Sequence, residues 1–124
     1  MQAIGSFIGK DLSQIVLPIT FYEPFTVLMK PAEQMFFNEG FTKAASLKDS
    51  PSVERMLHVV ASLTQSYFVV PNRIGKPLNP HLGETYELAT PSFHYFSEHV
   101  SVQPPVSVVN CQGQGYEYQR TLEW

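Results

Sequence analysis

The apolar positions of residues 50–70 recur every three or four residues, the spacing of one helix face. Ser50 is suited to cap this helix, Pro51 fits its first position, and Glu54 lies where the helix dipole favours an acid. The apolar stripe comprises Val53, Met56, Leu57, Val60, Thr64 and Tyr67. We expect this stripe to face the core, and we expect His58 on the opposite face to be solvated.

The preceding residues predict shorter helical elements divided by prolines. Residues 24–47 favour two helical pieces, with Pro24 at a first helical position and Pro31 breaking or restarting the helix. A further break is expected at 38–40. Residues 1–20 are loosely amphipathic and favour a short helix packed on the rest of the domain.

The periodicity changes after residue 84, where short runs become rich in β-branched and aromatic residues. The predicted strands are residues 85–89, 93–100, 106–110 and 116–124. Residues 112–115, Gln-Gly-Gln-Gly, are typical of a hairpin connection. Helices first and antiparallel strands afterwards predict an α+β fold with an open sheet.

Composition narrows the class of protein. The 124 residues suffice for one modest domain, and the net charge of −3 gives no general attraction to nucleic acid. Cys111 is the only cysteine, which excludes an internal disulfide and favours a reducing, intracellular setting. The sequence contains no apolar run of about 18 residues, and its N-terminus does not resemble a signal peptide.

A metal site or a small hydrolase centre could be built around His94 and Glu98. Strand geometry gives this hypothesis little support. His94 and Glu98 lie on the same face of the strand but are separated by two side-chain repeats, and His99 points to the other face. Further ligands would have to come from His58 or His81, with no supporting spacing. We therefore expect no catalytic residues, no metal and no cofactor.

The segment 73–84 is more informative. Gly75 and Pro77 fix the backbone on both sides of Lys76, and a second proline follows Asn79. A rigid loop that presents one ammonium and one amide is suited to a phosphate or polyol headgroup. A structural proline-rich connection with a solvated lysine explains the same residues equally well.

Four separated motifs then indicate a family. They are IGKDLSQIVLPITFYEP at 8–24, SVERMLHVVASLTQSY at 52–67, KPLNPHLGETYEL at 76–88 and EHVSVQPP at 98–105. In this order they resemble oxysterol-binding proteins and their relatives, over almost the whole chain.

The resemblance implies the first part of an incomplete antiparallel β-barrel around an apolar tunnel, because the family's domain is considerably longer than this chain. Residues 1–20 would form a lid, 21–70 a helical layer, and 71–124 the headgroup loop and first barrel strands. The implied function is non-vesicular transfer of a sterol or related lipid between membranes. The implied location is cytoplasmic and peripheral, at the endoplasmic reticulum and membrane contact sites.

The same resemblance assigns site residues. Lys76 and Asn79 correspond to the family's headgroup ligands. The lipid tunnel would include Tyr67, Ser66, Phe7 and Ile8.

One motif departs from the family pattern. Where the family has two histidines before the Pro-Pro pair, this chain has Val102 and Gln103. Valine cannot donate to a phosphate, and glutamine offers only a neutral amide. Phosphoinositide binding is therefore expected to be impaired, whereas a sterol in an apolar tunnel is less affected. The alternative is a non-transferring lipid sensor or interaction remnant of the family.

Overall fold

The computed structural model describes residues 18–65, 67 and 75–123, so Phe7, Ile8 and Ser66 lie outside the described residues. The helical elements are η2 (Ile19–Phe21), α2 (Lys30–Gln34), η3 (Met35–Phe37), α3 (Glu39–Ser46) and α4 (Ser52–Gln65). The strands are β1 (Tyr22–Thr26), β2 (Lys76–Leu78), β3 (Thr85–Ala89), β4 (Phe93–Val102), β5 (Pro105–Gly113) and β6 (Tyr116–Glu123). None of the described helices has the length and apolar character needed to cross a membrane.

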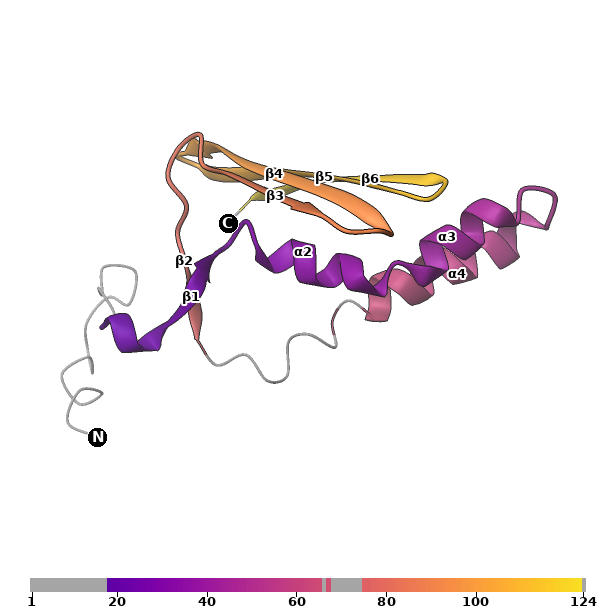
Figure 1. Ribbon diagram of the computed structural model, residues 1–124, viewed down its shortest axis with the longest axis horizontal. Helices are drawn as coiled ribbons and strands as arrows, with labels where there is room; N and C mark the ends of the chain where they lie inside the picture. Colours follow the sequence, from indigo (N-terminus) through magenta and orange to yellow (C-terminus); the bar gives the residue numbers. More distant parts are fainter. Residues whose placement is uncertain (1–17, 66, 68–74, 124) are drawn as a thin grey trace.

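The larger sheet confirms the predicted α+β class. Its strands follow in the order β3-β4-β5-β6, all antiparallel, and the helices lie on one side of it (Figure 1). The hairpin predicted at residues 112–115 is present, with Gln114 and Gly115 between β5 and β6. Gly115 has φ +80°, a conformation that glycine adopts without strain.

The core lies between the inner face of the larger sheet and the helical turns of α2 and η3. Along β4 every second residue from Phe93 to His99 is buried, as expected for a strand with one face covered. The central cluster consists of Ala32, Met35, Phe93, Tyr95, Val109, Cys111 and Leu122. Residues from α2 and η3 therefore cover the inner face of β4, β5 and β6.

The expectation of a helix beginning at Pro24 is wrong. Pro24 lies within β1, which pairs in parallel with β2 as a separate two-stranded sheet. A strand with a partner on one side only tolerates a proline, because one of its edges needs no ladder donor. Pro31 does occupy the first turn of α2, as a restarted helix requires.

The predicted core face of α4 is also wrong. Val53 is 68% exposed and Leu57 is 64% exposed, whereas His58 is half-buried and Ser62 is 2% exposed. The reason is Gly40 in α3, where an added Cβ would lie 2.5 Å from the backbone oxygen of His58. The missing side chain lets α3 pack closely on this polar face, which leaves the apolar stripe outside.

Candidate functional site

A cavity of about 580 Å³ lies where β1, β2 and the β4–β5 hairpin meet. We call it the Lys76 cavity. It is lined by Val27, Lys30, Lys76, Pro77, Asn79, Pro80, His99, Val102 and Pro105.

The small parallel sheet positions one wall of this cavity. Tyr22 is registered with Lys76 and Thr26 with Leu78, and the Val27 amide donates to the Leu78 carbonyl at 3.1 Å. This pairing carries Lys30, the first residue of α2, to the same cavity as Lys76. The predicted rigid loop is thus in part a strand, and pairing rather than proline alone fixes its backbone.

A β-bulge in β4 shapes the opposite wall. His99 is registered with Ser107 and Ser101 with Val106, so Val100 has no separate partner on β5. Strict alternation would place His99 and Val102 on opposite faces of the strand. The extra residue of the bulge places both on the same face. Both side chains line the Lys76 cavity.

His99 is held firmly within this wall. It is 4% exposed, and its Nδ1 lies 2.9 Å from the Ser107 hydroxyl. Its backbone amide donates to the Glu84 carbonyl at 3.0 Å, and its carbonyl accepts from the Gly83 amide at 2.8 Å. These contacts join the segment that follows Pro80 to β4.

The charged lining of the Lys76 cavity is positive. Among the described residues that line it, Lys30 and Lys76 are charged, His99 can carry a charge, and none is acidic. Lys30 Nζ lies 3.5 Å from Glu23 Oε2, which orients the lysine. Apart from Asn79, the remaining wall is formed by valine and proline side chains, so the site suits a molecule with an anionic or polar end and an apolar body.

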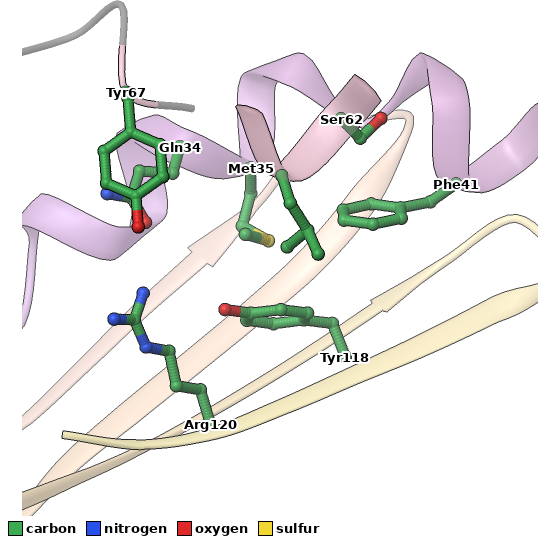
Figure 2. A pocket seen from close by; sticks show the side chains of 8 residues that line it. Gln34, Met35, Phe41, Ser62, Tyr67, Tyr118 and Arg120 are labelled. Atoms are coloured by element: carbon green, nitrogen blue, oxygen red, sulfur yellow. The ribbon is translucent and has the colours of Figure 1, made fainter. Parts of the chain in front are cut away.

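A second cavity contains the predicted tunnel residue Tyr67 (Figure 2). It measures about 250 Å³ and lies between the helices and β6. Its lining residues are Gln34, Met35, Phe41, Ser62, Leu63, Tyr67, Tyr118 and Arg120. Figure 2 shows Arg120 pointing from β6 toward Tyr67 and Gln34, so these three polar side chains gather at one end of the cavity.

Lys76, Asn79 and Val102 line one cavity, and Tyr67 lines another. Gln103 lies exposed in the β4–β5 turn and does not line the cavity. The sequence reasoning missed Lys30, and it considered His99 without assigning it to the headgroup site. Strand alternation could have found His99, which shares the inner face with Tyr95.

His94 has a different partner from the one considered in the sequence. Its Nε2 lies 2.6 Å from Glu87 Oε1 on the neighbouring strand, and both side chains are exposed. Residues 18–65, 67 and 75–123 contain no group of three or more His, Cys, Asp or Glu side chains placed to hold a metal ion.

Comparison with known proteins gives consistent matches. The family model described as Oxysterol-binding protein matches residues 1–124. The chain is 36% identical over 117 residues to oxysterol-binding protein homolog 2 of Saccharomyces cerevisiae, covering 93% of this chain and 9% of that protein. It is 38% identical over 120 residues to human oxysterol-binding protein-related protein 6, covering 94% of this chain and 13% of that protein. The chain thus spans about a tenth of the length of these relatives.

Two solved structures share the fold. The Osh1 ORD domain in complex with ergosterol matches with a TM-score of 0.82 at 33% identity, covering 95% of this chain and 28% of that chain. The Osh3 ORD in complex with PI(4)P from Saccharomyces cerevisiae has a TM-score of 0.82 at 28% identity, covering 98% of this chain and 33% of that chain.

Proposed function

The chain belongs to the oxysterol-binding protein family, and from this membership we propose that it binds one membrane lipid at the Lys76 cavity. The lipid is a sterol or a related lipid, and the chain carries it between membranes. Lys76 and Asn79 contact its polar end.

One observation carries this proposal: an ammonium and an amide from the same short segment meet an apolar wall in one cavity. Ligand sites are typically mostly apolar, with a few polar groups that fix orientation, and span about 300–1,000 Å³. The cavity volume of about 580 Å³ falls in this range. Its two lysines suit a headgroup that carries oxygen acceptors.

The lipid class is supported by the similar solved structures, one bound to ergosterol and the other to PI(4)P. In this chain Val102 gives the cavity no donor and Gln103 lies outside its lining. A phosphoinositide would therefore depend on the remaining donors, whereas a sterol needs fewer of them. Tyr67, in the second cavity, is proposed to contact a more distant part of the lipid.

The test is lipid extraction from vesicles. The chain is mixed with phosphatidylcholine vesicles containing either a fluorescent sterol or a phosphoinositide, the vesicles are sedimented, and lipid in the supernatant is measured. Saturable extraction of either lipid is expected. Lys76→Ala should weaken phosphoinositide extraction about tenfold, the equivalent of one hydrogen bond to a charged group.

The matched control is Lys48→Ala, which removes an equal charge from an exposed residue outside the cavity lining. This variant should extract lipid as well as the unmodified chain. Failure of the folded, unmodified chain to bind either lipid would refute the proposed function. Vesicle binding without extraction would identify the alternative, a sensor that does not transfer.

A further inference from the structure

A buried histidine faces the Lys76 cavity with one ring nitrogen unused. His99 is 4% exposed, and its Nδ1 is engaged by the Ser107 hydroxyl. Within the described part of the chain, no residue makes a hydrogen bond to its Nε2. Nε2 is not among the described side-chain atoms that are both fully buried and unpartnered, so it keeps access to solvent and is available to a ligand in the cavity.

Ser107 leaves this nitrogen free to donate in either charge state of the ring. A serine hydroxyl can both donate and accept. When the imidazole is neutral, Ser107 can donate to Nδ1 and the ring proton resides on Nε2. When it is protonated, Nδ1–H donates to Ser107 and Nε2–H is still available. Ser107 is completely buried, so its 2.9 Å contact with Nδ1 is shielded from solvent.

The surroundings select an anion as the acceptor. Lys30 and Lys76 also line this cavity, and none of the described lining residues is acidic; Glu23, which pairs with Lys30 at 3.5 Å, lies outside the lining. The bulge at Val100 places Val102 on the same wall, where its side chain offers no competing donor. A phosphate has enough oxygen acceptors to bind an imidazole, an ammonium and an amide together.

We propose that His99 donates a hydrogen bond from Nε2 to a phosphate monoester on a lipid headgroup bound in the Lys76 cavity. This inference rests on the proposed function of that cavity. It assigns the donor role to position 99 on the inner face of β4, in place of Val102 and Gln103. The chain therefore accepts a phosphate-bearing lipid without a histidine at either of those positions.

A free phosphate would meet the same donors, and only the apolar part of the lining distinguishes it from a lipid phosphate. Val27, Val102 and Pro105 form an apolar part of the lining that inorganic phosphate does not use. Burying such surface contributes about 25 cal/mol per Å² only when the ligand brings apolar atoms of its own. This favours a lipid over a soluble anion.

The first measurement compares vesicle binding by His99→Gln with binding by the unmodified chain. Glutamine keeps a polar side chain of similar reach but removes the imidazole. The probes are phosphatidylcholine vesicles containing phosphatidylinositol 4-phosphate and matched vesicles containing phosphatidylinositol. We expect affinity for the first kind to fall about tenfold, as for one lost hydrogen bond to a charged group, with little change for the second.

His81→Gln is the control, because this histidine has a side chain that is 94% exposed and lies outside the cavity lining. Its affinity should equal that of the unmodified chain. Circular dichroism and urea midpoints establish that both variants are folded before their affinities are compared.

The second measurement does not depend on a variant. In a chain labelled with ¹⁵N-histidine, a short-chain phosphatidylinositol 4-phosphate should shift the His99 Nε2 resonance and leave that of His81 unchanged. A larger shift with the lipid than with inorganic phosphate at equal concentration supports the lipid source. An equal shift with both overturns it.

The inference and the proposed function fail in different ways. If Lys76→Ala weakens binding to the phosphoinositide vesicles but His99→Gln does not, and Nε2 does not shift, the role of His99 is refuted while the cavity keeps its function. If the folded chain binds neither a phosphoinositide nor a sterol, both are refuted.

Discussion

The Tyr95 hydroxyl donates a 2.8 Å hydrogen bond to the backbone oxygen of Leu28, which lies 67 residues earlier in the chain. Ser97, two residues further along β4, donates to the same oxygen at 3.1 Å. All three residues are completely buried, and burial raises the pKa of Tyr95 well above its ordinary value of 10.0. The connection between β1 and α2 is thereby fixed to the inner face of β4, next to Val27 in the cavity wall.

Removing one of these donors should lower the free energy of unfolding only slightly. Removing both should lower it by more than the sum of the two single effects. Tyr95→Phe or Ser97→Ala leaves one donor on the Leu28 oxygen, so each should lower the free energy of unfolding by about 0.5–1.5 kcal/mol. The double variant leaves a buried carbonyl unsatisfied, which adds about 1–3 kcal/mol. Urea unfolding of all four proteins measures this coupling, and simple additivity would contradict the shared-acceptor account.

Gly40→Ala should destabilise the packing of α3 on α4. In a helix interior this change ordinarily stabilises by about 1 kcal/mol. Here the new Cβ would lie 2.5 Å from the His58 backbone oxygen and closer still to the Ser62 hydroxyl. We expect a net loss of about 1–3 kcal/mol, as for overpacking, measured by thermal or urea unfolding.

Ser62→Ala provides the matched test of this contact. The Ser62 hydroxyl is buried and has no hydrogen-bond partner among the described residues, so its removal should be neutral or slightly stabilising. Adding it to Gly40→Ala should recover part of the loss but not all of it, because the His58 oxygen belongs to the backbone. Full recovery would show that only the hydroxyl was in conflict.

The sheet was predictable because local signals and tertiary environment agree there. Residues 85–89 alternate between exposed and partly buried positions and include β-branched and aromatic side chains. They form β3 with the predicted bounds. The glycines near the β5–β6 hairpin also favour a turn locally, because glycine readily adopts the backbone conformations that turns require. In α4, by contrast, the apolar stripe was recognised but assigned to the wrong environment, since helix periodicity defines a face and not what covers it. The close approach at Gly40 decides that question and is a tertiary contact.

The candidate site was predicted in part for the same reason. Lys76 and Asn79 stand close together in the sequence, so a motif can identify both. Val102 reaches the cavity through a bulge, and Lys30 reaches it through a parallel pairing that connects distant segments. No local pattern specifies a β-bulge one residue beyond His99. The face of the sheet on which Val102 lies therefore could not be derived before the strand register was known.

Polar substitutions in the exposed stripe of α4 should be tolerated. Leu57 is 64% exposed, so Leu57→Gln should change the free energy of unfolding by no more than about 0.5 kcal/mol. Leu28→Ala is the comparison, because Leu28 is completely buried and should lose about 2–5 kcal/mol. Equal losses in urea unfolding would mean that the stripe is covered in solution.

Glu117 should make stability depend on pH in the acid range. Asn110 and Gln119 each donate a side-chain hydrogen bond to its Oε1 at 2.9 Å, and these bonds lower the pKa of the carboxyl below its ordinary value of 4.5. Hydrogen bonds to the charged form favour that form. A depressed folded pKa contributes stability above the unfolded pKa, and this contribution is lost as pH falls through the folded pKa.

The measurement is carboxyl titration by NMR, together with urea unfolding of Glu117→Gln at several pH values. The unmodified chain should titrate Glu117 below 4.5, its ordinary pKa, and Asn110→Ala should raise that pKa toward it. Gln112→Ala is the control and should raise it less, since the Gln112 hydrogen bond is the smallest of the causes that lower the pKa. The stability difference from Glu117→Gln should shrink as pH falls below the folded pKa. A difference that stays constant across this range would show that the hydrogen bonds do not distinguish the two protonation states.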